Sequence, residues 1–265
     1  MEDNNIHNLR QQKILKVLSS NSYLSVIDLA NTFQVTEATI RKDLRYLENL
    51  GLVSRKHGGV VGCQDSIIVG ETHNLSKEKI HISEKQLIAQ AALNLINDQD
   101  FVSLAPGTTT QYLATEIVNS EIQNLSVLSA TINTSVILQN KSDINLMQVG
   151  GDIRLSSGAA VGIYSEQMIK NYFSGKLFFG ADGIDLQFGI STSTTVEVEL
   201  NRMMIENSEK VILLADSSKI GKRGFSKIVD IECIDVLITD AHISDNDYHN
   251  IKDLGIEIII AEEKP

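Results

Sequence analysis

The sequence predicts an α/β protein in which a small N-terminal winged helix-turn-helix is joined to a larger, mostly parallel α/β domain. Basic residues gather within the first 60 positions, whereas short apolar runs alternate with amphipathic stretches from residue 83 onward. Between these two regions the periodicity is lost. We therefore expect a winged helix-turn-helix over residues 5–60, a linker over 61–76 and the α/β domain over 77–265.

The composition is that of a globular protein. Of its 265 residues, 42% are hydrophobic and 22% are charged, so the chain can bury a substantial core. Cys63 and Cys233 lie far apart without zinc-type spacing, which predicts a reducing compartment, no disulfide and no metal site. The chain has no apolar run long enough for a membrane span and no signal-peptide pattern at its start, so we expect a cytoplasmic protein.

Two helices are predicted before the basic segment. Residues 10–18 place apolar side chains at helical spacing. Ser25, with Asp28 three positions later, indicates a capping box that opens a second short helix, and residues 33–35 form the turn that follows it. The side chains of this second helix that we expect to be buried are Leu29, Ala30 and Phe33.

A third helix is predicted from Thr36, which caps its start, to a C-terminal stop at Gly51. Its apolar residues recur at steps of four and three and form one stripe, while basic side chains on the opposite face are free to meet phosphates and base edges. A hairpin over residues 52–60 follows as a wing with a basic tip. The apolar stripe consists of Ile40, Leu44, Leu47 and Leu50. The residues expected to contact DNA are Thr36, Ala38, Thr39, Arg41, Lys42 and Arg45 on the helix, and Arg55, Lys56 and His57 on the wing.

A basic helix face can also be merely a solvated run of charge. The distribution of charge along the chain favours the functional interpretation. Residues 1–60 hold eight basic and six acidic residues, a net of +2, so the other 205 residues carry −13 of the total of −11. An acidic protein that keeps its positive charge at one end is expected to meet a polyanion there.

Alternation of strands and helices predicts βαβ units and a mostly parallel sheet covered by helices on both faces. The predicted strands cover residues 101–104, 126–128, 145–149, 177–179, 211–215, 236–239 and 256–260. The predicted helices cover residues 84–96, 109–118, 134–138, 165–172 and 196–206.

Glycines, hydroxyls, carboxylates and a lysine follow the predicted strands, and ligands of open α/β sheets bind at the carboxyl ends of strands. The turn over residues 107–110 offers backbone N–H groups, threonine hydroxyls and a helix N-terminus, which together suit a phosphate. The expected ligand-binding residues are Gly107, Thr108, Thr109, Thr110, Gly150, Gly151, Asp182, Asp185 and Lys219. Each has a structural alternative, because glycines permit sharp turns, the threonines and aspartates can cap, and Lys219 can pair with Asp216 or remain a surface lysine.

These segments resemble the DeoR family of bacterial transcriptional regulators over nearly the entire chain. The matching residues of the N-terminal signature and wing are Arg10, Ile14, Leu18, residues 36–44 and residues 55–59. Those similar to the family's sensor domain are residues 104–114, 150–151, 179–185, 214–219 and 238–240.

The resemblance implies a sequence-specific transcriptional regulator that represses a sugar-utilisation operon. Its implied partners are double-stranded operator DNA and a phosphorylated sugar that releases or modulates it, and its larger domain is implied to be similar in fold to ribose-5-phosphate isomerase. Because a monomer reads only a short half-site, we expect a homodimer or homotetramer, with no cofactor and no membrane contact.

Two positions depart from the family pattern. Ala105 stands where the family commonly has Asp, and Ser129 with Ala130 stands where it commonly has Thr-Asn. Both changes remove polar groups from the predicted crevice. We therefore expect an effector unlike those of typical members, or one held by fewer hydrogen bonds.

The alternative function is a sugar-phosphate isomerase or deaminase-like enzyme with a DNA-binding module. Asp182 or Asp185 would then act as base and Lys219 as electrostatic stabiliser. Against it, Ala105 leaves the threonine loop without a carboxylate, and the chain has no GxSxG elbow. A third hypothesis makes the basic helix a protein-docking surface. We favour the regulator and predict no catalytic residues.

Overall fold

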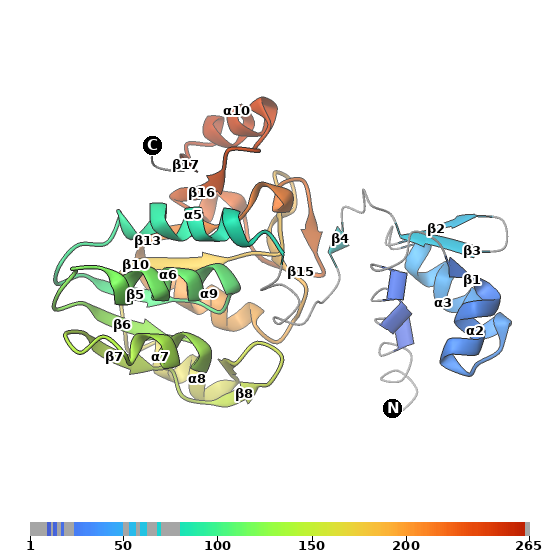
Figure 1. Cartoon of the computed structure of the whole chain (residues 1–265), viewed down its shortest axis with the longest axis horizontal. Coiled ribbons are helices and arrows are strands. Elements are labelled where there is room, and N and C mark those ends of the chain that lie inside the picture. The colour runs from blue at the N-terminus through green and yellow to red at the C-terminus, as the bar shows by residue number, and fades with distance from the viewer. Residues whose placement is uncertain are drawn as a thin grey trace.

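The computed structural model forms a small N-terminal module and a larger α/β domain (Figure 1). The described residues are 10, 11, 13, 14, 17, 18, 24–49, 53–56, 59–62, 68–69 and 80–262. The predicted positions Leu50, Gly51 and His57 lie outside them.

The N-terminal module is the predicted winged helix-turn-helix. The described residues between 10 and 18 are helical, and two further helices follow, α2 (Val26–Phe33) and α3 (Glu37–Asn49). The strands are β1 (Leu24–Ser25), β2 (Val53–Lys56) and β3 (Gly59–Gly62), which form an antiparallel sheet in the order β1-β3-β2. The third strand ends at Gly62, so the wing continues two residues into the expected linker.

Capping and periodicity explain the helices of this module. Ser25 Oγ accepts a hydrogen bond from the Asp28 backbone N–H at 3.0 Å, as the predicted cap requires. Gln34 then ends α2 in the left-handed region at φ 52°, which turns the chain toward α3. The module core contains Ile14, Leu18, Leu29, Ile40, Leu44, Leu47, Val53 and Val60, all buried, with Phe33 packed at its edge.

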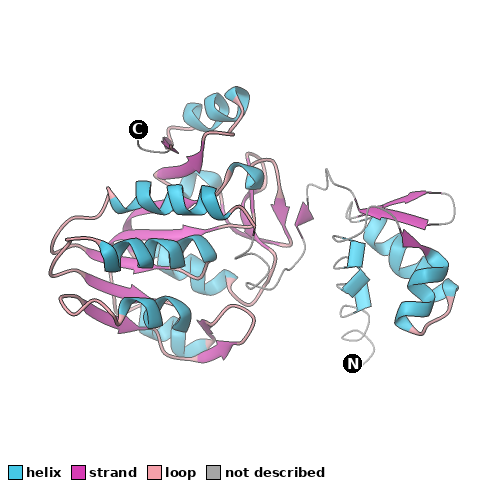
Figure 2. Ribbon diagram, viewed as in Figure 1, coloured by secondary structure: helices cyan, strands magenta, loops and turns pink. Residues whose placement is uncertain are grey.

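The larger domain is built on a seven-stranded sheet in which every neighbouring pair is parallel. Its strands are β5 (Phe101–Leu104), β6 (Ser126–Ser129), β7 (Asn145–Gln148), β10 (Ser174–Gly180), β13 (Ser208–Leu214), β16 (Val236–Asp240) and β17 (Glu257–Ala261). They follow the order β17-β16-β13-β10-β5-β6-β7, and each overlaps one of the seven predicted strands. Figure 2 shows this sheet between its helices.

Helices cover both faces of the sheet. They are α5 (Ile82–Leu93), α6 (Thr108–Asn119), α7 (Ile132–Leu138), α8 (Ile163–Ile169), α9 (Val198–Glu206) and α10 (Asp245–Asp253). Successive strand residues point to opposite faces, so Phe178 joins the core beneath α5 and α6, whereas Phe179 joins the core beneath α8 and α9. Two separate apolar layers therefore hold the sheet on its two sides.

Several short elements were not predicted. The strands of two or three residues among them carry too little alternation to be recognised. Among them are a hairpin of β8 (Asp152–Arg154) with β9 (Ala159–Val161), and an antiparallel sheet of β11 (Gly183–Asp185), β12 (Gly189–Thr192) and β15 (Ser226–Val229). A further pair joins β4 (Ile68–Val69) to β14 (Arg223–Gly224). The expected irregular linker over 61–76 therefore contains the end of β3 and all of β4.

Candidate functional site

The face of α3 opposite the core is basic and exposed. Ala38, Arg41, Lys42 and Arg45 are all exposed, whereas Ile40 and Leu44 are fully buried. Thr36 Oγ1 accepts from the Thr39 backbone N–H at 3.3 Å and lies 2.9 Å from Thr39 Oγ1, so both hydroxyls take part in capping the helix.

The basic side chains of α3 differ in the ion pairs and hydrogen bonds that they make within the protein. Arg41 is paired with Glu37 at 2.8 Å, and both side chains are about half exposed. Such an exposed pair contributes little to stability. Arg45 Nε donates to the Arg41 carbonyl at 3.4 Å. Within the described part of the chain, Lys42 makes no ion pair.

The wing places its predicted residues on one strand. Arg55 and Lys56 belong to β2, opposite Val60 and Gly59 of β3. The hairpin is therefore present where the sequence predicted it, while the predicted contact residue His57 falls outside the described residues.

A buried carboxylate ties α3 to the first helix and was not predicted. Asp43 is 1% exposed and accepts from Arg10 Nε at 2.6 Å and from Gln11 Nε2 at 3.1 Å. Its position was a usable signal, because residue 43 falls between Ile40 and Leu47 on the apolar stripe. An acid on that stripe needs a partner inside the module.

The threonine loop lies between β5 and α6 and contains both structural and free groups. Thr110 Oγ1 lies 2.9 Å from the Ala105 carbonyl and 2.8 Å from the Gly107 carbonyl, to which it donates. Thr108 and Thr109 are buried, and their hydroxyls make no hydrogen bond within the described part of the chain. No side chain caps α6. Its first backbone N–H groups are therefore available to an anion.

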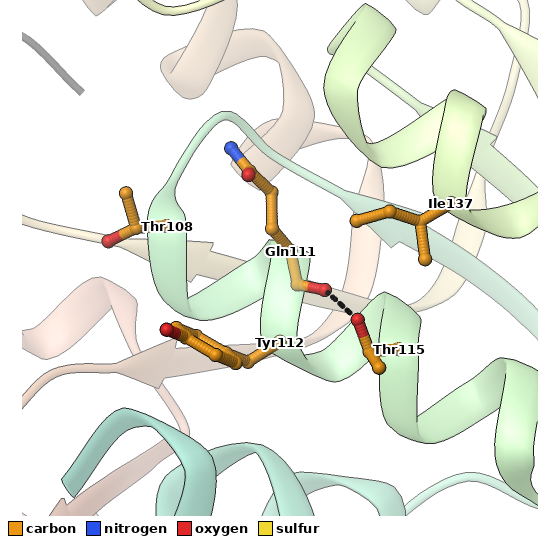
Figure 3. Close-up of a pocket in the computed structure, with 5 residues that line it drawn as sticks. All are labelled: Thr108, Gln111, Tyr112, Thr115 and Ile137. Carbon is orange, nitrogen blue, oxygen red and sulfur yellow. Dashed lines mark hydrogen bonds between the residues drawn. The ribbon is translucent and has the colours of Figure 1, made fainter. Parts of the chain in front are cut away.

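A surface hollow borders the start of α6 (Figure 3). Its lining consists of Thr108, Gln111, Tyr112 and Thr115 from α6 and Ile137 from α7. Thr115 Oγ1 donates back to the Gln111 carbonyl at 3.2 Å. Of the predicted effector residues, the hollow contains Thr108 alone.

The two glycines after β7 have different roles. Gly151 has φ +132°, and a Cβ there would lie 2.1 Å from Ser165 Oγ and 2.9 Å from the Val161 carbonyl oxygen. Only glycine fits that position. Gly150 has open space around a Cβ, and its carbonyl accepts from Ser165 Oγ at 2.7 Å.

Both predicted aspartates are engaged internally. Asp182 accepts from the Ser193 backbone N–H at 2.8 Å and from Ser193 Oγ at 2.6 Å. Asp185 lies 2.9 Å from Arg223 Nε and accepts from the Phe188 N–H at 2.7 Å. Burial raises the pKa of Asp185, but the bonds from Arg223 and the loop amides outweigh burial and hold that pKa below 3.8. Both carboxylates therefore brace loops.

Lys219 ends a short 3-10 turn, η1 (Ser217–Lys219), after β13. Asp216 caps this turn by accepting from the Ser218 N–H at 3.2 Å. Lys219 is partly exposed and makes no ion pair within the described residues. Its ammonium group is free to bind an anion.

Asp240, at the end of β16, was not predicted as part of the site. It is 2% exposed and accepts from the Ser217 N–H at 2.7 Å and from the His242 N–H at 2.9 Å. Burial raises the pKa of Asp240, but these hydrogen bonds outweigh it and leave that pKa below 3.8. The charge of Asp240 holds the turn that carries Lys219.

Comparison with known proteins identifies both parts of the chain. Residues 10–66 match the DeoR-like helix-turn-helix domain, and residues 80–241 match the DeoR C terminal sensor domain. The chain belongs to the DeoR family. It is therefore a transcriptional regulator and not an enzyme, so the isomerase-like alternative is wrong.

Full-length relatives of this DeoR-family chain carry regulator names. It is 32% identical over 256 residues to a putative aga operon transcriptional repressor of Escherichia coli O157:H7, covering 96% of this chain and 94% of the relative. It is 30% identical over 241 residues to a lactose phosphotransferase system repressor of Streptococcus mutans, covering 89% and 93%. A ribose 5-phosphate isomerase structure from Methanocaldococcus jannaschii matches with a TM-score of 0.38 at 16% identity, over 51% of this chain and 53% of that one.

The DeoR-family chain brings several strand-end residues together at the carboxyl edge of its sheet. A Cβ on Gly107 would lie 4.0 Å from the Gly180 backbone, so the loop after β5 contacts the carboxyl end of β10. Asp182 then joins the loop after β10 to Ser193. Among the described residues, no hydrogen bond or ion pair links Lys219 to the threonine loop. The hydroxyl-rich run 191–195 was a signal for this site that the sequence interpretation did not use.

The described residues contain neither a membrane-length apolar helix nor a cluster of side chains suited to a metal ion.

Proposed function

We propose that this DeoR-family regulator represses a sugar-utilisation operon. A phosphorylated sugar, bound at the carboxyl edge of the parallel sheet, modulates its affinity for double-stranded operator DNA. The observation that carries the proposal is the exposed basic face of α3 on a chain whose net charge is −11. The repressor names of the E. coli and S. mutans relatives support the sign of regulation and the link to sugars.

The DNA contacts follow from the geometry of α3. Arg41, Lys42 and Arg45 lie along the exposed face, where they meet base edges and phosphates when the helix enters the major groove. Thr36, Ala38 and Thr39 lie at the N-terminal end of this face. Arg55, Lys56 and His57 of the wing contact the adjacent backbone or minor groove.

The effector's phosphate binds the N-terminus of α6. The uncapped N–H groups after Gly107, the free hydroxyls of Thr108 and Thr109, and the ammonium of Lys219 supply donors and positive charge. Gly150 remains available for close approach of the sugar. The other expected residues are Thr110, Gly151, Asp182 and Asp185, and they shape the loops around the phosphate. Thr110 and the two aspartates already have internal partners, and Gly151 is needed for its backbone conformation.

The regulator acts in the cytoplasm as a homodimer or homotetramer, with a DNA-binding module over residues 5–60, a linker over 61–76 and a sensor over 77–265. Two copies of α3 are needed to read two half-sites of an operator, because one winged module spans only a few base pairs.

Fluorescence anisotropy with a duplex from the region upstream of its own gene tests the proposal. We expect tight binding that weakens steeply with salt, as phosphate contacts require. Ribose 5-phosphate, glucose 6-phosphate, fructose 6-phosphate and inorganic phosphate are then added in turn. If the protein binds no DNA, or binds it with an affinity that does not depend on salt, the proposal of a DNA-binding regulator is wrong. If none of the sugar phosphates changes the DNA affinity, the proposed class of effector is wrong.

A further inference from the structure

The strand pair β4–β14 ties the segment between the DNA-binding module and α5 to the sensor domain. β4 (Ile68–Val69) follows β3 in the chain and pairs in parallel with β14 (Arg223–Gly224). Ile68 is the register partner of Arg223, and Val69 is that of Gly224. A displacement of β14 therefore acts directly on the backbone at residues 68 and 69.

The sensor holds β14 closely. The Gly224 N–H donates to Ser191 Oγ at 2.7 Å, and that hydroxyl donates to the Gly183 carbonyl at 3.1 Å. A Cβ on Gly224 would lie 2.5 Å from the carbonyl carbon and oxygen of Thr192, so the two backbones are in contact. Arg223 is bound in turn by Asp185 at 2.9 Å. β14 therefore moves together with β11 and β12.

The same segment begins at the proposed phosphate ligand. From Lys219 the chain reaches β14 within four residues, and it runs beside β11 throughout. The Gly221 N–H donates to the Ile184 carbonyl at 2.8 Å, and a Cβ on Gly183 would lie 2.5 Å from the Lys222 carbonyl oxygen. Only three residues separate Lys219 from β14, and they contact β11, so a shift of the Lys219 backbone is passed on to β14.

We propose that the β4–β14 pair carries the state of the sensor to the DNA-binding module. This inference rests on the proposed function. When Lys219 closes on a phosphate, residues 219–224 shift together with β11 and β12, and the paired backbone of Ile68 and Val69 shifts with them. Sugar phosphate and operator DNA each favour one arrangement of this pair, so each changes the affinity for the other.

Backbone N–H groups of β4 provide the test. Ile68→Pro and Val69→Pro each remove one N–H from the strand, whereas the matched controls Ile68→Ala and Val69→Ala keep it. In the full-length protein we measure operator affinity with and without ribose 5-phosphate, glucose 6-phosphate and fructose 6-phosphate, together with the thermal shift that each compound produces. Amide hydrogen exchange of the peptide covering residues 219–229 is followed with and without operator DNA alone.

We expect sugar phosphate to change operator affinity of the wild type about five-fold or more, and operator DNA to change exchange at 219–229. At least one proline variant loses both the change in operator affinity and the change in hydrogen exchange while keeping the thermal shift. Both alanine variants keep all three responses. The inference is wrong if sugar phosphate still changes operator affinity fully in both proline variants, or if saturating DNA leaves hydrogen exchange at 219–229 of the wild type unchanged. Either result leaves the proposed function intact. A wild type that binds no DNA overturns both.

Discussion

The guanidinium of Arg10 lies against the buried carboxylate of Asp43, with Nε 2.6 Å from Oδ2, and so fastens the first helix to the DNA-binding helix. Removing one partner from such a pair leaves a buried group without its charge partner. We expect Asp43→Ala to lower the free energy of unfolding of the N-terminal module by about 3 kcal/mol. Urea unfolding followed by circular dichroism measures the change.

Glu37→Ala is the matched control for that experiment. It removes a carboxylate from the same helix, but one whose pair with Arg41 is exposed, and its cost should stay below about 1 kcal/mol. Equal effects of the two substitutions would show that the Arg10–Asp43 pair does not fasten the module.

Arg45→Ala should weaken operator binding about ten-fold or more without unfolding the protein, because the side chain is exposed. If Arg45 also contacts a phosphate, the slope of log affinity against log salt falls by about 1. Arg41→Ala should act in the same direction. Lys170→Ala, which removes an exposed positive charge from the sensor, serves as control and should leave affinity unchanged. Operator affinity equal to wild type in both arginine variants contradicts the proposed docking.

Neighbouring threonines of the α6 loop should behave differently. Thr109→Val removes a hydroxyl without an internal partner and should reduce the thermal shift given by sugar phosphates while leaving the melting temperature of the free protein unchanged. Thr110→Val removes a hydroxyl whose single proton lies between two loop carbonyls and should cost about 1 to 2 kcal/mol of stability. Differential scanning fluorimetry with and without ribose 5-phosphate measures both. If Thr109→Val instead lowers stability and Thr110→Val instead reduces the thermal shift, the roles assigned to these two residues are wrong.

Asp240 should make the sensor sensitive to acid. Its pKa lies below 3.8 in the folded chain, so its ionised form stabilises the fold. That contribution is fully present above about pH 4 and is lost as the pH falls through the folded pKa. Asp240→Asn should therefore flatten the dependence of unfolding free energy on pH below about pH 4. Urea titrations at several pH values test this, with the exposed Asp253→Asn as control.

Prediction from sequence succeeded where the signal is local. The steps between Ile40, Leu44 and Leu47 fix which face of α3 is buried, and Ser25 with Asp28 fixes where α2 begins. The seven main strands were found for the same reason, since each is a short apolar run between helices. Short strands such as β4 and β14 were missed because two residues carry no periodicity, and pairing with a distant strand alone creates them.

The sequence by itself determined the family, the winged module with its basic face, and the parallel sheet, because neighbours three, four or two positions apart encode helices and strands. Only the tertiary structure decided which polar groups are still free. Asp185 meets Arg223 across 38 positions, and Asp43 meets Arg10 across 33, whereas Lys219 meets no charged partner among the described residues. These contacts join residues that are far apart in the sequence, so local sequence patterns cannot predict them.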